Sequence, residues 1–391
     1  RTTSTVKPTL LDLALNTGVI GVPDEDFEPA VLQVSINALP PSSEYAKADA
    51  ETLADFTLAA SPGAVVQTYR RTSFSGITAL QSESGNGAMG FMPSGSGNEE
   101  NVFSAVGRAH YAPAAVPTGV HMPLARVTGG TYIGKVLHKV YEDIDTSADN
   151  LLSEVERAVN QWVSGRMLAE HRKNIIDGVH LSLNTPLGPM FGERTLGSIS
   201  PANMLAELDF EMSLAELSKG VMASDIGTVL LQMLPENDPL RPYATMLTHH
   251  SFNIPLAGLL NGSIDAVLRL GTAEAPLLFI TDYKSNRLDS EDDAQVIDAY
   301  APSRLVHAME HHHYPLQALL YGTCIFRMLR WRAPHLNPDT TIGGVAYFFI
   351  RGMVGEKTPV DGAGNPYGVF TWRAPAGLWE RLSDLFAGVR P

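Results

Sequence analysis

Residues 263–286 read SIDAVLRLGTAEAPLLFITDYKSN, two apolar runs separated by a short stretch of small residues, Glu and Pro. Apolar runs of this length on either side of turn residues predict a β-hairpin. If Leu270 pairs with Leu277, the same antiparallel register places Asp265 directly opposite Asp282. The stretch therefore predicts two carboxylates that share one face of a hairpin.

The chemistry of this hairpin depends on what lies beside the carboxylates. Cross-strand neighbours have Cβ atoms about 4.5–5.5 Å apart, so Asp265 and Asp282 would repel each other unless a cation bridged them. Because side chains alternate along a strand, Lys284 lies on the same face as Asp282, about 6.6 Å further along. Oxygen ligands favour Mg²⁺ over Zn²⁺, and such an ion activates water for phosphodiester hydrolysis. Lys284 would then orient or deprotonate that water. A surface hairpin decorated with an Asp–Lys salt bridge explains the pattern equally well.

Further elements are predicted around the hairpin from the spacing of their apolar residues. Helical spacing predicts a helix over 133–143, with His138 beside its apolar face. Strict alternation predicts a half-buried strand over 205–212, with Glu207 on its polar face. Strands flanked by helices without a regular repeat predict an α/β domain with a mixed central sheet. The remaining predictions are helices over 149–173, 314–331 and 377–388, a strand over 345–350, and strand-and-turn structure over 178–198.

The N-terminal part of the chain differs in character from the rest. Residues 1–70 carry short apolar runs broken by Pro and Ser, which predicts an irregular extension, either a connector or a domain remnant. Residues 82–120 are rich in Gly, Ser, Asn and Pro, which predicts a long mobile insertion. The main domain is therefore predicted over 71–391. Because the first residue is Arg1 rather than Met, we expect a fragment of a longer polypeptide or a processed product.

The composition limits the classes of protein that fit. With 44% hydrophobic and 18% charged residues over 391 residues, it is typical of a soluble globular protein. Cys324 is the single cysteine, which excludes an internal disulfide and any four-cysteine zinc or iron–sulfur site. No run reaches the roughly 18 apolar residues of a membrane span, so we expect a cytoplasmic protein without membrane contact. The formal net charge of −14 argues against a sequence-independent coat on nucleic acid.

Two polar clusters contain possible metal ligands, but neither has the pattern of a metal site. Asp289 and the acidic residues 291–293 are typical of a solvated helix start. His311, His312 and His313 are consecutive, and consecutive residues on a helix point in different directions. The histidines are therefore predicted to form a solvated or partly packed run.

Seven segments along the chain form an ordered set: YRRTSFS (69–75), GTYIGKVLHKVYE (130–142), the strand around Glu207, ID (264–265), DYKSN (282–286), YPLQALLY (314–321) and GGVAYFFIRG (343–352). This set resembles the C-terminal nuclease domain of RecB, the beta subunit of bacterial exodeoxyribonuclease V, within the PD-(D/E)XK nuclease superfamily. The resemblance is long and colinear, and it implies a restriction-endonuclease-like core with a mixed sheet flanked by helices. The loop between Asp265 and Asp282 is a few residues longer than this family leads us to expect, and the 82–120 insertion is unfamiliar.

The resemblance also implies roles for individual residues. His138 takes its role from a GxxxGxxxH pattern; by itself it would more often be a surface or core histidine. Without the family, helix capping and packing would explain Gln317 and Tyr321 as well as a QxxxY motif does. The implied roles are metal binding for His138, Asp265, Asp282 and the Tyr283 carbonyl, catalysis for Lys284 with Asp282 and Asp265, the acidic position of the first catalytic strand for Glu207, and support of the lysine or contact with DNA for Gln317 and Tyr321.

The function implied by the resemblance is that of an Mg²⁺-dependent exodeoxyribonuclease module of a RecB-like helicase–nuclease subunit in bacterial double-strand-break repair and homologous recombination. Ca²⁺ or Mn²⁺ could take the place of Mg²⁺. The expected partners are DNA single strands and duplex ends, with RecC-like and RecD-like subunits. No GxxxxGK[ST] loop occurs in the sequence, so ATP is expected only for an upstream motor. Residues 1–70 would then be a connector or the tail of that upstream helicase region. The alternative is a catalytically inactive nuclease-fold scaffold or DNA-binding module.

Overall fold

A computed structural model describes residues 71–83, 120–163, 170–288 and 297–389, together with two short N-terminal strands. By its internal contacts the chain divides into two units, Arg1–Val65 and Val66–Pro391. In the first unit, β1 (Val19–Ile20) pairs antiparallel with β2 (Leu32–Gln33). The predicted insertion at 82–120 and the acidic cluster at 289–293 lie almost wholly outside the described residues. The predicted connector role of residues 1–70 stays a prediction.

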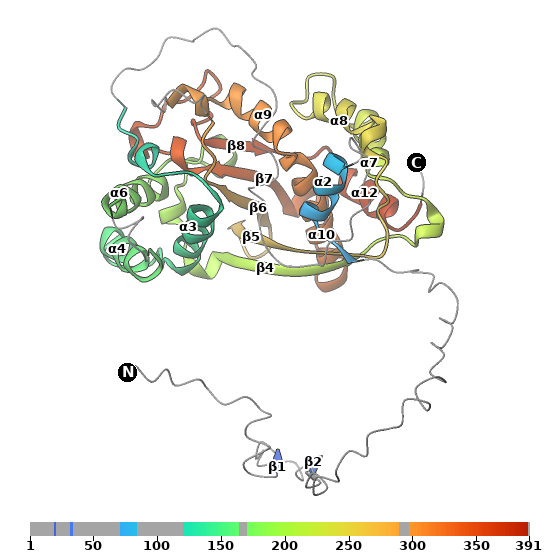
Figure 1. Cartoon of the computed structure of the whole chain (residues 1–391), viewed down its shortest axis with the longest axis horizontal. Coiled ribbons are helices and arrows are strands. Elements are labelled where there is room, and N and C mark those ends of the chain that lie inside the picture. The colour runs from blue at the N-terminus through green and yellow to red at the C-terminus, as the bar shows by residue number, and fades with distance from the viewer. Residues whose placement is uncertain are drawn as a thin grey trace, which may run out of the picture. The chain divides into compact units, whose positions relative to one another are not determined.

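The second unit contains strands and groups of helices in an irregular order along the chain (Figure 1). Its strands are β3 (Arg71–Thr72), β4 (Met204–Ser213), β5 (Leu259–Gly271), β6 (Pro276–Lys284), β7 (Ile342–Phe349) and β8 (Val369–Trp372). Its helices are α2 (Phe74–Glu83), α3 (Thr131–Asp143), α4 (Leu151–Trp162), α6 (Arg172–Leu183), α7 (Ala223–Met233), α8 (Arg241–Leu247), α9 (Pro302–His311), α10 (Tyr314–Arg332), α11 (Pro338–Thr341) and α12 (Leu378–Phe386).

The strands of this unit form a single mixed sheet. Its order is β3-β5-β6-β7-β8, and β4 also pairs with β5. The β4–β5, β5–β6 and β7–β8 pairs are antiparallel, whereas β3–β5 and β6–β7 are parallel. All eight residues of β7 are buried, which is typical of a central strand covered on both faces. The predicted α/β class with a mixed central sheet is confirmed.

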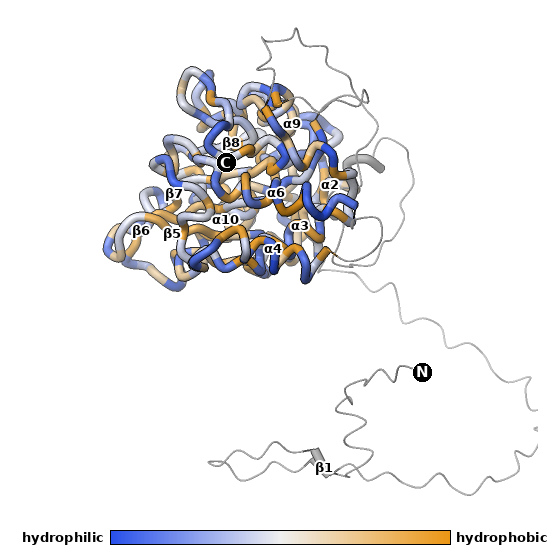
Figure 2. Tube along the Cα trace, turned by 90° about the vertical axis from the view of Figure 1, so that its left-hand side faces the viewer, coloured by the Kyte–Doolittle hydropathy of each residue, from blue (hydrophilic) through white to orange (hydrophobic). Residues whose placement is uncertain are grey.

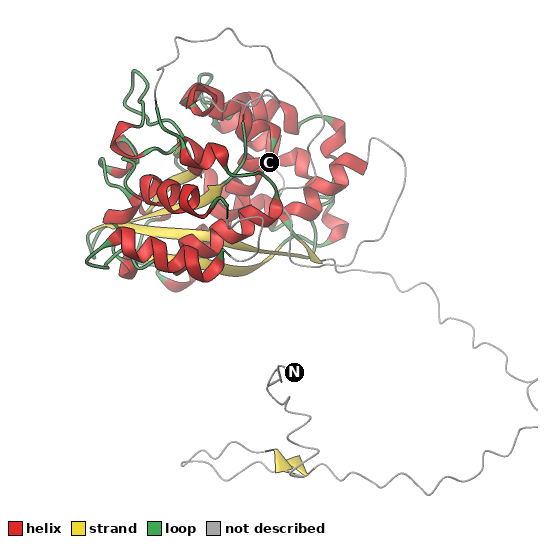
Figure 3. Cartoon of the chain, turned by 60° about the vertical axis from the view of Figure 1, so that its left-hand side comes forward, coloured by secondary structure: helices red, strands yellow, loops and turns green. Residues whose placement is uncertain are grey.

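Helices cover both faces of the sheet and enclose two hydrophobic cores. One core holds α3, α4 and α6 against one face, and the other holds α2, α7, α8, α9, α10 and α12 against the opposite face. Figure 3 shows the strands as a layer with helices on either side, and Figure 1 shows the two helix groups apart. Hydrophobic and hydrophilic stretches alternate along the tube in Figure 2, as expected for elements with one buried side. Within the described residues, no helix has the length and apolar character needed to cross a lipid bilayer.

The register of the predicted hairpin is confirmed. Leu270 pairs with Leu277, and the ladder continues by one pair to Gly271 and Pro276 at the turn. At the other end it stops at Ala266 and Thr281, one position before the two aspartates. The predicted alternation in β4 is confirmed too, because its residues are in turn half-buried and exposed from Met204 to Glu211. The helices predicted over 133–143, 314–331 and 377–388 correspond to α3, α10 and α12.

Two local predictions were wrong. Residues 178–183 were predicted as strand and turn, but they complete α6. Ile175, Val179 and Leu183 are spaced four residues apart and all pack into one core. The burial of this face stabilises the helix despite the low helix propensity of Gly178 and Val179. The single helix predicted over 149–173 is interrupted: α4 ends at Trp162, Val163 has an extended backbone, and α6 begins only at Arg172. Residues 164–169 lie outside the described part.

The three consecutive histidines do not lie on one helix. His311 is the last residue of α9, His312 is its C-cap, and His313 adopts a left-handed φ of 56° as the N-cap of α10. This junction turns the chain between two helices. The predicted packing of the run is correct for His313, which is 5% exposed.

Candidate active site

The predicted site lies where β5 and β6 separate. Along one edge β5 carries β4 from Leu259 to Leu268. Along its other edge, β5 pairs with β3 at Leu259–Leu260 and with β6 only from Ala266 to Gly271. Past Thr281, β6 continues beside β7 alone. We call the opening between the two strands the β5–β6 fork; Asp265 borders it on β5, and Asp282 to Lys284 border it on β6.

A change of face in β4 and β5 accompanies the fork. Ile264 packs into the core that holds α10, whereas Ala266, two residues later, packs into the core that holds α3. Residues two apart on a regular strand share a face, so the strand is irregular at Asp265. The ladder to β4 skips the Glu207–Asp265 pair, and Glu207 has a φ of 50°. A left-handed non-glycine residue costs about 1–2 kcal/mol, and such strain often accompanies functional sites.

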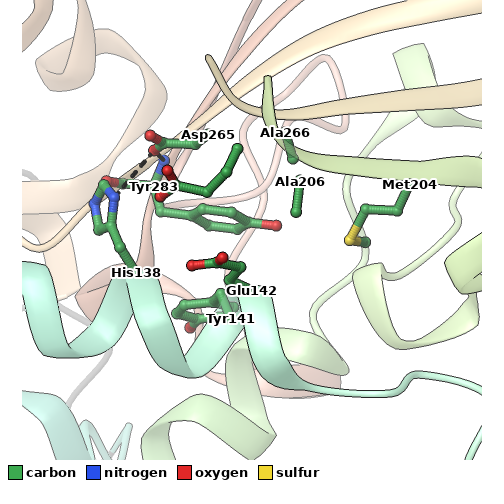
Figure 4. Close-up of a pocket in the computed structure, with 9 residues that line it drawn as sticks. His138, Tyr141, Glu142, Met204, Ala206, Asp265, Ala266 and Tyr283 are labelled. Carbon is green, nitrogen blue, oxygen red and sulfur yellow. Dashed lines mark hydrogen bonds and ion pairs between the residues drawn. The ribbon is translucent and has the colours of Figure 1, made fainter. Parts of the chain in front are cut away.

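His138 reaches the fork from α3 (Figure 4). Its Nε2 lies 2.8 Å from the carbonyl oxygen of Tyr283, and its Nδ1 lies 3.4 Å from Asp265 Oδ2. The backbone N–H of Tyr283 donates to the same carboxylate at 2.8 Å. His138, Asp265 and the Tyr283 backbone are therefore joined in one small network, although 145 positions separate the histidine from the tyrosine.

The charges of this network shift the pKa of each partner. Burial alone would lower the pKa of His138, but the Asp265 carboxylate outweighs it and raises the pKa to about 9. Burial alone would raise the pKa of Asp265, but the His138 charge and hydrogen bond hold it below its usual value. At neutral pH the two side chains therefore form an imidazolium–carboxylate pair.

Lys284 and Asp282 form a second pair on the buried side of the fork. Lys284 Nζ lies 2.8 Å from Asp282 Oδ2, and the two side chains are 4% and 3% exposed. The ammonium also lies 4.0 Å from the ring centroid of Tyr314 and 5.7 Å from that of Tyr347. The sequence predicted Lys284 beside Asp282, and the structure places them together.

The remaining predicted residues lie on either side of these pairs. Glu207 is 41% exposed, lies 3.8 Å from Lys139 Nζ and lines a small pocket with His138 and Asp265. Gln317 is fully buried; its Nε2 donates to the Tyr321 hydroxyl at 3.1 Å and its Oε1 accepts from the Tyr347 hydroxyl at 3.1 Å. Gln317 thus reaches Lys284 through Tyr347, and its burial disfavours direct contact with DNA.

Within the part of the chain that the structure describes, no group of three His, Cys, Asp or Glu side chains is arranged to hold a metal ion. The predicted donors are paired with one another and with Lys284 instead. Their chemistry nevertheless fits a small divalent ion. His138 Nε2 and the Tyr283 carbonyl oxygen are 2.8 Å apart, and neighbouring ligands of an octahedral Mg²⁺ are about 2.9 Å apart. The metal site stays a prediction.

Sequence reasoning missed three residues that support this site. Tyr314 lies three positions before Gln317, where its aromatic ring gave no signal of its own. Lys139 follows His138 directly and contacts both Glu142 and Glu207. Arg351, 1% exposed, donates to the backbone carbonyl of Ser285 at the end of β6, and a charged residue after the apolar run of β7 could have signalled it.

Comparison with curated proteins gives relatives of one kind. The RecBCD enzyme subunit RecB of Mycolicibacterium smegmatis is 35% identical over 336 residues, covering 84% of this chain and 30% of the relative. RecB of Mycobacterium tuberculosis H37Rv is 39% identical over 334 residues, covering 81% and 28%. RecB of Escherichia coli K12 is 27% identical over 327 residues, covering 82% and 23%. No protein-family model matches the chain.

The chain spans less than a third of the length of these relatives. The similarity nevertheless extends over more than four fifths of the chain itself. Over most of its own length, this sequence is therefore similar to one region of RecB.

Proposed function

We propose that this chain is the nuclease module of a RecB-like subunit and hydrolyses phosphodiester bonds of DNA with the help of Mg²⁺. The observation that carries the proposal is the convergence of His138, Asp265, Asp282 and Lys284 at the β5–β6 fork. Three separate segments, α3, β5 and β6, supply these residues, and the side chains of Lys284 and Asp282 are almost completely buried. Buried charges of this kind are costly unless they serve a purpose.

Some residues of the fork would bind the metal ion, and Lys284 would position the attacking water. Asp265, Asp282 and the Tyr283 carbonyl would hold the ion, with His138 Nε2 as a further ligand once its proton has left. When bound, the ion would neutralise charge on the phosphate and lower the pKa of a bound water. The Lys284 ammonium, held 2.8 Å from Asp282, would orient the attacking water and offset the charge that develops on the phosphoryl oxygens.

The acidic composition fits a catalytic chamber that receives its substrate from elsewhere. A net charge of −14 gives weak electrostatic capture of a polyanion. We propose that a helicase motor and RecC-like and RecD-like partners deliver single strands and duplex ends to the fork, as part of double-strand-break repair. The RecB relatives support this assignment by their name, which places them in the RecBCD enzyme.

The decisive experiment measures degradation of end-labelled single-stranded DNA with and without MgCl₂. We expect Mg²⁺-dependent cutting that Asp282→Ala and Lys284→Ala each reduce at least about 100-fold, because both remove a group that acts in the transition state. Asp209→Ala is the matched control, because Asp209 is an exposed acid on β4 outside the fork. Undiminished cutting by both fork variants would refute the proposal.

A catalytically inactive scaffold is the second candidate, favoured by the pairing of Asp265 with His138 and of Asp282 with Lys284. Calorimetric titration with CaCl₂ separates the two candidates. A nuclease should release heat that disappears in Asp265→Asn and Asp282→Asn. A scaffold should show the same heat, or none, in the wild-type chain and in both variants.

A further inference from the structure

Tyr314 occupies a central place beside Lys284. It is the first residue of α10, its side chain is buried, and the face of its ring lies 4.0 Å from Lys284 Nζ. Lys284 is itself 4% exposed, so water contributes little to the stability of its charge. The ring of Tyr314 replaces part of the lost hydration, because a cation is attracted to the face of an aromatic ring.

The ring of Tyr314 is fixed from several directions. Its hydroxyl donates to Asn286 Oδ1 at 3.1 Å, and its carbonyl accepts from the Tyr347 hydroxyl at 3.1 Å. The ring stacks on His312 at 5.2 Å and on Tyr347 at 5.6 Å between centroids. A ring held this firmly can set the place of the flexible lysine side chain that lies against it.

The same contacts connect Lys284 to α10. The Tyr347 hydroxyl donates both to Tyr314 O and to Gln317 Oε1, and Gln317 in turn donates to Tyr321. Asn286 lies two residues after Lys284, just past the end of β6, so the hydrogen bond from Tyr314 returns to the segment that carries the lysine. The end of β6, the Tyr314 ring and α10 are thus connected by hydrogen bonds around the Lys284 ammonium group.

We propose that Tyr314 is a positioning residue that holds Lys284 Nζ against Asp282 through the face of its ring. The Tyr314 hydroxyl has a lesser part, because it donates its proton to Asn286 Oδ1. The inference rests on the proposed function in one respect: Lys284 has a catalytic role only if the chain is a nuclease. The placement of Lys284 can be tested without any activity.

The first test is spectroscopic and uses the whole chain labelled with ¹³C at lysine Cε. Protons above the face of an aromatic ring are shifted upfield by its ring current, so the Hε protons of Lys284 should resonate upfield of those of the other lysines. Lys284→Arg assigns the signal. Tyr314→Phe should keep the upfield shift, and Tyr314→Leu should lose most of it. A wild-type signal within the range of the other lysines would overturn the proposal, even if the leucine variant does not fold.

The second test is kinetic. Tyr314→Leu should lower kcat for single-stranded DNA by about 10- to 30-fold, the loss expected from a desolvated cation–π contact. KM should change less than about twofold, because the ring acts through Lys284 and not on DNA. Tyr314→Phe should retain kcat within about threefold. Leu382→Ala, a buried position on α12, is the stability control: it should lower the unfolding midpoint without moving the lysine signal.

The outcomes separate this inference from the proposed function. An upfield lysine signal that depends on the Tyr314 ring, in a chain that does not cut DNA, would support the positioning and refute the nuclease. Cutting by the wild type with an unchanged kcat in folded Tyr314→Leu would refute the positioning alone. Equal loss of kcat in Tyr314→Phe and Tyr314→Leu would also refute it, because the hydroxyl and not the ring would then matter.

Discussion

Arg351 shows how a single buried residue fixes the relative position of two parts of the site. It is 1% exposed, and it donates to the backbone carbonyls of Ser285 at 2.6 Å, Val127 at 2.8 Å and Thr128 at 3.1 Å, and also to that of Leu124. Ser285 follows Lys284, and Val127 and Thr128 precede α3, which carries His138. One guanidinium therefore joins the lysine strand to the histidine helix.

Replacing Arg351 by Met should lower the free energy of unfolding by about 3 kcal/mol or more. The methionine fills similar space but leaves several buried carbonyls without their donor, and each such loss costs about 1–3 kcal/mol. Urea unfolding followed by circular dichroism measures the change. Arg330→Met is the control, because Arg330 is 60% exposed and pairs with Glu380 at 3.3 Å. It should cost less than about 1 kcal/mol, and equal losses in both variants would contradict the argument.

At this scale, sequence reasoning reached the residues that local geometry controls. Asp265, Asp282 and Lys284 follow from the register of one hairpin, a contact between near neighbours in sequence. His138 and Glu207 came only from the family resemblance, because their approach to the fork joins distant segments. Tyr314, Lys139 and Arg351 were missed for the same reason: their contacts depend on how α3, α10 and the sheet pack together.

Among the elements, α10 shows most clearly how packing depends on one residue. The helix is buried along most of its length, and Gly322 lies against the indole ring of Trp379 on α12. A Cβ atom at this position would collide with that ring. The glycine is thus required by the close approach of the two helices rather than by its backbone conformation.

Gly322→Ala should therefore destabilise the protein, although alanine favours a helix by about 1 kcal/mol. Overpacking typically costs about 1–3 kcal/mol, so we expect a net loss and a lower thermal midpoint in calorimetry. Gly362→Ala is the matched control, because a Cβ there has no neighbour within 4 Å. Its midpoint should stay within about 1–2 °C of the wild type. A higher midpoint for Gly322→Ala would show that α12 moves away at little cost.

The elements also show where sequence patterns fail. Strong alternation in β4 and the hairpin turn gave correct strands, because those signals are local. The end of α6 was mistaken for a strand because Gly178 and Val179 disfavour a helix, yet both are buried against neighbouring helices. The change of face at Asp265 could not be predicted from the sequence, because it depends on the left-handed backbone of Glu207 on the neighbouring strand β4.

For the molecule as a whole, stability should depend on pH through a buried histidine that is not among the predicted metal ligands. His313 lies at the junction of α9 and α10, with its Nδ1 3.2 Å from the Tyr243 hydroxyl of α8 and its ring against Phe252. Burial lowers its pKa to about 4, and the neighbouring charge of His311 contributes in the same direction. The folded protein therefore holds His313 neutral.

The unfolded chain protonates this histidine near pH 6.5, whereas the folded protein does so only near pH 4. Stability from the neutral form is thus present above about pH 6.5 and is lost as the pH falls towards 4. The loss should approach 3 kcal/mol in urea unfolding at a series of pH values. His313→Asn tolerates the left-handed backbone and removes the titration. Its unfolding free energy should fall less steeply over this range, and an identical slope would contradict the assignment.

The class of fold was predictable at this scale because strands flanked by helices permit few arrangements. The broader relationship to RecB came from the order of several motifs, and it agrees with the comparison to the mycobacterial relatives.

The shared change of face in β4 and β5 determines where this protein can gain or lose residues. The turn at 272–275 lies beyond the last pair of the hairpin, so its length can vary without moving Asp265. An insertion of one residue within β5, in contrast, would turn every side chain beyond it to the opposite face. It would separate Asp265 from Glu207 unless β4 gained a residue at the matching position. The two strands therefore have to change together, and deletion scanning should find a tolerant turn next to an intolerant pair of strands.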